Sequence, residues 1–196
     1  MTTVFIGGSI TIRHLDAKVQ DRIMNIVHQK FDVIVGDADG ADASIQQFLA
    51  DQRYQHVTVF CTGNVPRNNI GQWAIRQVKS YHSPGSRAYF TAKDLAMAEA
   101  ADSGLMIWNA KSSGTLSNVI ELLSRKKYSL AFVDKLKTFH AIKSVEALEQ
   151  LLNHMPSPER RKADVKIGLS GKVSVLRSRE LQMSLLAERP AIIAHH

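Results

Sequence analysis

The chain has 196 residues, of which 44% are hydrophobic and 22% charged. This length and composition are typical of a globular protein with one buried core and a smaller appendage. No apolar run approaches the roughly 20 residues that a membrane span needs, so we expect no membrane partner. The N-terminus leads into an apolar strand without a basic signal region, which predicts a cytoplasmic protein.

The single cysteine, Cys61, excludes an internal disulfide framework, and the histidines are scattered without metal-ligand spacing. We therefore predict no structural metal. His195 and His196 end the chain and are left out of the site reasoning because they resemble a tag remnant.

The net charge of +7 is unevenly distributed. Residues 155–196 contain eight Lys and Arg against four Asp and Glu, a net +4 in this segment alone. A basic tail of this kind suits nucleic acid, but a solvated surface or an oligomer interface explains the charges equally well. All three interpretations stay open.

Short apolar runs alternate with amphipathic helices as far as residue 133. We predict strands at residues 4–6, 33–35, 57–60, 105–107 and 130–133. Helices are expected over residues 16–30 and 41–49, from Thr91 with Asp94 as a capping-box partner, and from Gly114 to Leu123. Right-handed crossovers return each strand beside an earlier one. The predicted class is therefore α/β, a Rossmann-like, doubly wound, mostly parallel sheet of five to six strands.

The pattern changes beyond residue 133. A strand at residues 139–142 and a helix capped by Ser144 close a predicted domain of residues 1–154. A linker follows, and apolar residues then alternate with polar ones around Ser170-Gly171, which predicts a β-hairpin and a short helix over residues 178–188. Such an appendage is marginal alone, so residues 155–196 are expected to pack on their own domain or on a second protomer of a homo-oligomer, a dimer or higher.

Two Gly-rich loops follow predicted strands at the carboxyl edge, where doubly wound sheets bind ligands. Because the glycines of the first loop have no Cβ atom, backbone N–H groups there are able to approach a phosphate. The second loop places small residues at the positive end of a helix. The residues are Gly7, Gly8 and Ser9 in the first loop, and Ser112, Ser113, Gly114 and Thr115 in the second. A tight turn or plain N-capping explains each loop alone, but together they favour a phosphate site.

A third loop, residues 36–42, crowds acidic side chains before a helix. One of them is explained by the helix dipole alone. The others suit hydrogen bonds from ribose hydroxyls or a base, with a divalent ion less favoured. The candidate ligand residues here are Gly36, Asp37, Ala38, Gly40 and Asp42, with Asp39 a further possible acid.

Other side chains in the loops are also candidates. Arg67 and Asn68 are donors in a stretch too polar for a simple connector, and Arg67 has the geometry for bidentate phosphate binding. Trp108 follows a strand end and is a candidate for stacking on a base, although core packing is the safer interpretation for it and for Trp73. Lys93 is more readily explained as a helix residue than as part of a site.

These loops in this order resemble the SLOG superfamily, Rossmann-like nucleotide-binding domains that include the LOG phosphoribohydrolases and the DprA proteins. The chain is similar above all to small stand-alone bacterial members. The resemblance covers roughly residues 3–135 and rests on residues 7–9, 36–42, 67–68, 101–108 and 113–115. It implies a nucleotide or nucleotide derivative bound by the first and second loops, residues 7–9 and 112–115. No resident cofactor is expected, and nothing in the sequence supports Mg²⁺.

The catalytic residue of LOG enzymes is missing. Those enzymes place a glutamate three residues after the Gly-Thr threonine, and here that position is Asn118, which has no ionisable group. Lys111 and Ser112 also replace two family glycines. The remaining catalytic candidates are Asp42, Asp94 and Glu121, the last of which is more readily explained as a helix-surface residue.

Three functions are therefore open. The first is binding or sensing of a nucleotide or nucleotide derivative without turnover, which fits intact phosphate loops beside a lost glutamate. The second is a nucleoside-monophosphate N-glycosidase that uses a carboxylate from another loop. The third is DprA-like single-stranded DNA binding through the basic tail.

Overall fold

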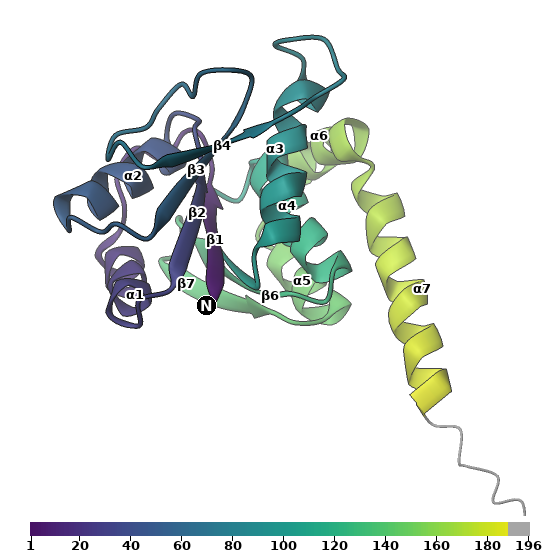
Figure 1. The fold of residues 1–196 in the computed structure, drawn as a ribbon. Helices are drawn as coiled ribbons and strands as arrows, with labels where there is room; N and C mark the ends of the chain where they lie inside the picture. Colours follow the sequence, from purple (N-terminus) through teal and green to yellow (C-terminus); the bar gives the residue numbers. More distant parts are fainter. Residues whose placement is uncertain (188–196) are drawn as a thin grey trace, which may run out of the picture.

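The computed structural model describes residues 1–187 and shows an α/β fold built on one twisted sheet (Figure 1). The sheet has seven strands in the order β4-β3-β2-β1-β5-β6-β7. Neighbouring strands are parallel except for the antiparallel pair of β6 and β7. The strands are β1 (Thr3–Gly8), β2 (Asp32–Gly36), β3 (Val57–Thr62), β4 (Ala74–Val78), β5 (Ser103–Trp108), β6 (Tyr128–Val133) and β7 (Thr138–Ile142).

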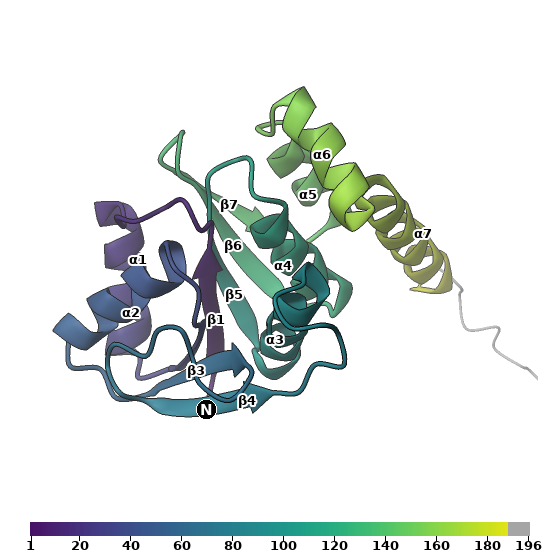
Figure 2. The same ribbon diagram turned by 90° about the horizontal axis from the view of Figure 1, so that it is seen from above.

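Helices cover both faces of the sheet (Figure 2). One face carries α1 (Ala17–His28) and α2 (Ala41–Asp51), and the other carries α3 (Arg87–Ala100), α4 (Ser113–Ser124) and α5 (Val145–Leu152). Alternate strand residues supply the two cores, because successive side chains of a strand point to opposite faces. Ile6 packs toward α1 and α2, whereas its neighbour Phe5 packs toward α3 and α4. The predicted doubly wound class is therefore confirmed.

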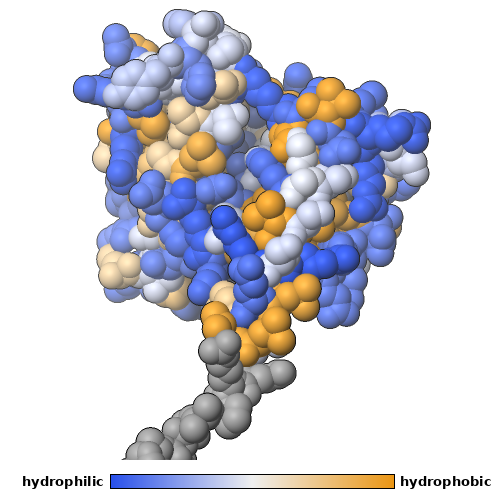
Figure 3. Space-filling model, turned by 90° about the vertical axis from the view of Figure 1, so that its right-hand side faces the viewer, coloured by the Kyte–Doolittle hydropathy of each residue, from blue (hydrophilic) through white to orange (hydrophobic). Residues whose placement is uncertain are grey.

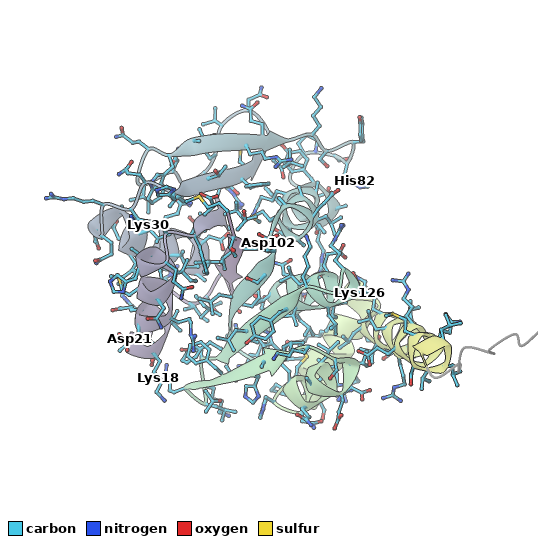
Figure 4. The ribbon with its side chains drawn as sticks, turned by 60° about the horizontal axis from the view of Figure 1, so that its bottom comes forward. Lys18, Asp21, Lys30, His82, Asp102 and Lys126 are labelled. Carbon is cyan, nitrogen blue, oxygen red and sulfur yellow. The ribbon has the colours of Figure 1, made fainter. Side chains whose placement is uncertain are left out.

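The strand order reverses between β1 and β5. The chain builds the sheet outward from β1 through β2, β3 and β4, then returns to place β5 on the other side of β1. At the amino ends, the N–H of Thr3 on β1 donates to Asp102 just before β5, at 2.8 Å (Figure 4). Beyond the carboxyl ends, the chain continues from β1 to α1 on one face of the sheet and from β5 to α4 on the other. A doubly wound sheet has its ligand crevice at this point.

Two details of the main domain differ from the prediction. The sheet has seven strands rather than five or six, because β4 forms at an edge where its side chains are mostly exposed and give no apolar run. Helix α3 begins at Arg87 with Ser86 as its N-cap, so the predicted start at Thr91 is wrong. The Thr91 hydroxyl donates instead to the carbonyl of Arg87 within the helix.

The predicted C-terminal hairpin is also wrong. The segment forms two helices, α6 (Ser157–Ile167) and α7 (Leu169–Ala187), separated by Gly168 in the left-handed conformation. The alternation around Ser170-Gly171 was misleading, because Val165 in that pattern is 90% exposed. The buried residues Ala163, Leu169 and Leu176 join the core cluster beneath α4 and α5. Their spacing suits helices rather than strands.

The end of α7 extends beyond the rest of the described chain (Figure 1). Apolar side chains gather on its last turns, as Figure 3 shows, and Leu181, Met183, Leu185 and Leu186 are 49–67% exposed. None of the helices within residues 1–187 has the length and apolar character to cross a membrane.

Candidate functional site

A cavity of about 230 Å³ opens at the carboxyl ends of β1 and β5, between α3 and the start of α4. Phe5, Ile10 and Met97 give it an apolar part, and Gly8, Ala38 and Gly114 also line it. Its polar side chains are Asp42, Lys93, Asp94, Ser112, Thr115 and Asn118. The cavity therefore brings together parts of the first, second and third loops that the sequence predicts to bind a ligand.

The start of α4 forms one side of this cavity. Ser112 is the N-cap, and its hydroxyl accepts from the N–H of Thr115 at 3.2 Å. The N–H of Ser112 donates to Asn109 Oδ1 at 2.8 Å. Within the described chain, the N–H groups of Ser113 and Gly114 have no hydrogen-bond acceptor, as is usual for the first turn of a helix. Unpaired N–H groups at the positive end of a helix form an anion-binding position.

Most contacts of the first Gly-rich loop stabilise the fold and do not face the cavity. Ser9 is fully buried; its hydroxyl hydrogen-bonds Thr115 Oγ1 at 3.1 Å and accepts from the N–H of Asn109 at 3.1 Å. It joins the first and second loops and does not line the cavity. A side chain at Gly8 would meet the backbone of Ile107 and the side chain of Ala41, so close strand packing already requires a glycine there.

The other side of the cavity is acidic around one buried lysine. Lys93 is 4% exposed, and its ammonium lies 3.2 Å from Asp94, 3.6 Å from Asp37 and 3.9 Å from Asp42. Gly36 makes this arrangement possible, because a Cβ there would collide with the ends of Asp42 and Lys93. A buried ammonium needs such partners, since an isolated charge is very costly in the protein interior.

Burial and neighbouring charges shift the acidities in this cluster. Burial, reinforced by the charges of Asp94 and Asp37, raises the pKa of Asp42 to about 6, against the opposing effect of Lys93. Burial alone would lower the pKa of Lys93, but the three carboxylates outweigh it and raise that pKa, so the amine stays charged. Asp42 is consequently the carboxyl group in the cavity that changes protonation near neutral pH.

Asp37 is already paired within the protein. Burial tends to raise its pKa, but two hydrogen bonds from the Arg67 guanidinium, at 2.8 and 3.2 Å, and one from the Arg67 N–H lower it overall. The guanidinium also lies 4.7 Å from the ring centre of Phe90. Asn68 donates to the carbonyl of Asp37 at 2.9 Å and to Asp39 at 3.1 Å. Arg67 and Asn68 thus hold the 36–42 loop in place and do not line the cavity.

Four further sequence candidates lie away from the cavity. The ring of Trp108 is 1% exposed in the core, and its N–H donates to the Ser112 carbonyl at 3.0 Å, so it has no face on which a base can stack. Glu121 pairs with Arg125 at 2.8 Å on the outer side of α4, one turn beyond Asn118. Gly40 has a φ of +75° against the backbone of Ile10, which makes its role a conformational one. Trp73 is buried and donates to Tyr54.

Two residues of the site were not predicted as such. Lys93 was interpreted as an ordinary helix residue, and its central place depends on contacts with Asp37 and Asp42 from another part of the chain. Arg87 donates to the hydroxyl of Ser113 at 3.4 Å, which places its guanidinium beside the start of α4. No local pattern marks either residue: the partners of Lys93 lie far away in the sequence, and Arg87 precedes the predicted start of helix α3.

Comparison with models of known protein families finds none that matches the chain, and none of the curated proteins searched matches it. The resemblance to the SLOG superfamily stays a prediction from the ordered loops.

Proposed function

We propose that the protein binds a nucleotide or a nucleotide derivative, with a phosphate at the start of α4. The observation that carries this proposal is the pair of unpaired N–H groups of Ser113 and Gly114 beside a cavity at the strand-order reversal. A Cβ at Gly114 would have only the Ser112 hydroxyl, at 3.8 Å, within contact range, so the approach to these groups is open. Helix starts at this place in doubly wound sheets suit phosphate.

The opposite side of the cavity suits hydrogen-bond donors. Asp42 and Asp94 present carboxylate oxygens that accept from sugar hydroxyls or base N–H groups. The volume of about 230 Å³ is below the roughly 300–1,000 Å³ typical of complete ligand sites. The cavity therefore fits a phosphate and the adjoining sugar, and most of the base extends outside it. A phosphate at the start of α4 and sugar hydroxyls at Asp42 would hold the nucleotide in one orientation.

Calorimetric titration with AMP, GMP, CMP and UMP tests this proposal. We expect at least one of them to bind with a Kd in the micromolar range, about −8 kcal/mol. Absence of binding by all four at millimolar concentration would overturn it for nucleoside monophosphates.

A second candidate function, N-glycoside hydrolysis of a nucleotide, is favoured by one observation. Asp42 is buried in the cavity with a pKa near 6, so it is able to protonate a departing base, while Asp94 is a second carboxylate for the attacking water. Release of free base, lost in Asp42→Asn and declining above pH 6, is the expected result. Binding without any base release would leave the protein a nucleotide-binding protein that does not turn its ligand over.

The remaining expectations stay predictions. Membership of the SLOG superfamily, a homo-oligomer, a cytoplasmic location and DNA binding through residues 155–196 are not needed for the nucleotide proposal. DNA binding would appear as strongly salt-dependent affinity for single strands.

A further inference from the structure

A second hollow, of about 440 Å³, lies on the outer side of α3 and α4, where the turn between α6 and α7 meets them. Its ionisable residues are all basic: His82, Arg87, Lys166 and Lys172. Thr91 and Ser117 add hydroxyl groups, and no Asp or Glu within residues 1–187 lines it. We call this hollow the basic groove.

The basic groove and the cavity meet at the start of α4. The Arg87 guanidinium lines the groove and also donates to the hydroxyl of Ser113, at 3.4 Å. Ser113 carries one of the two unpaired N–H groups, and its neighbour Gly114 lines the cavity. A phosphate bound at these N–H groups would therefore lie next to Arg87, whose planar guanidinium suits phosphate oxygens.

The C-terminal helices supply the other cations. Lys166 lies in the last turn of α6 and Lys172 in the first turn of α7, on either side of the left-handed Gly168 that turns the chain. Within the described chain, neither lysine is in an ion pair, and Arg87 and His82 have no carboxylate partner. Cations gathered in one hollow repel each other unless an anion is bound between them.

We propose that the basic groove binds the phosphoryl groups beyond the first in a nucleoside di- or triphosphate. This inference rests on the proposed function, which places the first phosphate at Ser113 and Gly114. The groove suits a short polyphosphate better than a nucleic-acid strand, because no Phe, Tyr or Trp in the described part of the chain lines it to stack on bases. The basic appendage then completes the ligand site of the main domain.

Calorimetric titration of the full chain with AMP, ADP and ATP tests the inference. Each charge-assisted hydrogen bond from the groove to an added phosphoryl group strengthens binding. ADP or ATP should therefore bind at least about tenfold more tightly than AMP. In the double variant Lys166→Ala/Lys172→Ala this preference should disappear, while the affinity for AMP stays within about twofold. Both lysines are exposed, so the variant keeps its core. Lys126→Ala is the matched control, since Lys126 follows the opposite end of α4 (Figure 4).

The outcomes separate this inference from the proposed function. Equal affinities for AMP, ADP and ATP would overturn the proposal that the basic groove binds phosphoryl groups, and so would a preference for ADP or ATP that survives the double variant. Neither result would contradict the nucleotide proposal. If no nucleotide binds, the nucleotide proposal fails, and titration with inorganic tripolyphosphate then tests the basic groove by itself. Tripolyphosphate binding that is lost in the double variant supports a polyphosphate site in the groove. Absence of tripolyphosphate binding overturns it. A dT₁₂ oligonucleotide that binds more tightly than ATP through the same lysines would overturn it in favour of nucleic acid.

Discussion

The ammonium of Lys93 and a carboxylate oxygen of Asp42 lie 3.9 Å apart beside the cavity, with side chains only 5% and 10% exposed. The two residues come from helices on opposite faces of the sheet, α3 and α2. Their meeting at the carboxyl edge places buried, opposite charges next to the open start of α4. This charge arrangement should therefore affect both the stability of the fold and the binding of a ligand.

Removing Lys93 leaves buried carboxylates without their shared cation. We expect Lys93→Met to lower the free energy of unfolding by about 3–5 kcal/mol at pH 7, since breaking a buried ion pair leaves uncompensated charge. Urea denaturation followed by circular dichroism measures the change. Lys79→Met, at an exposed position, is the control and should stay within about 0.5 kcal/mol of the native protein. Equal stability of the two variants would show that the cluster does not depend on Lys93.

The raised pKa of Asp42 predicts a specific pH dependence. Its pKa is about 6 in the fold and 3.8 as the reference value, so the folded protein binds the Asp42 proton more tightly. Asp42 therefore reduces stability progressively as pH rises from about 4 to about 6, by about 3 kcal/mol in total. Asp42→Asn should be more stable than the native protein at pH 7.5, and the difference should vanish near pH 4. A difference that is constant with pH would contradict the buried, proton-binding carboxyl group.

Arg67 is expected to stabilise the 36–42 loop through Asp37. Arg67→Ala leaves a buried carboxylate with fewer partners, but the guanidinium side is 40% exposed, so we expect a cost of about 2 kcal/mol at pH 7. The pKa of Asp37 is lowered in the fold, so this stabilisation is present above pH 3.8 and is lost as pH falls below it. Denaturation at pH 7 and at pH 3 measures both effects. Loss of nucleotide binding without loss of stability would instead make Arg67 a direct ligand contact.

The helical C-terminal segment should be part of the folded core. Leu176→Ala should cost about 2–4 kcal/mol, because Leu176 is 6% exposed and joins the core cluster of α4 and α5. Leu185→Ala, at 67% exposure on the same helix, should cost less than about 0.5 kcal/mol. Thermal unfolding of both variants provides the comparison. Equal, small effects would mean that α7 does not pack on the domain.

The fold class and the ligand edge were predictable from the sequence because they depend on local patterns. Apolar runs marked β1 and β5, and small residues marked the start of α4 at Ser112. The exposed edge strand β4 has no such apolar run. The alternation of apolar and polar residues around Ser170 predicted a β-hairpin, although this segment forms a helix. The sequence favours Asp42 as a candidate but favours Lys93 as a plain helix residue, since the environment of Lys93 arises only when α2 and α3 converge. Trp108 at a strand end gave no sign of whether its ring faces the core or a ligand.

The central claim is that backbone N–H groups at the start of α4 bind a phosphate, and one pair of variants isolates them. Ser113→Pro removes an N–H at the first helical position, where proline is tolerated, and Ser113→Ala keeps that N–H while removing the same hydroxyl. We predict that the affinity for the tightest-binding nucleoside monophosphate falls at least about tenfold further in Ser113→Pro than in Ser113→Ala, at equal thermal stability. Equal affinities of the two variants would contradict the claim.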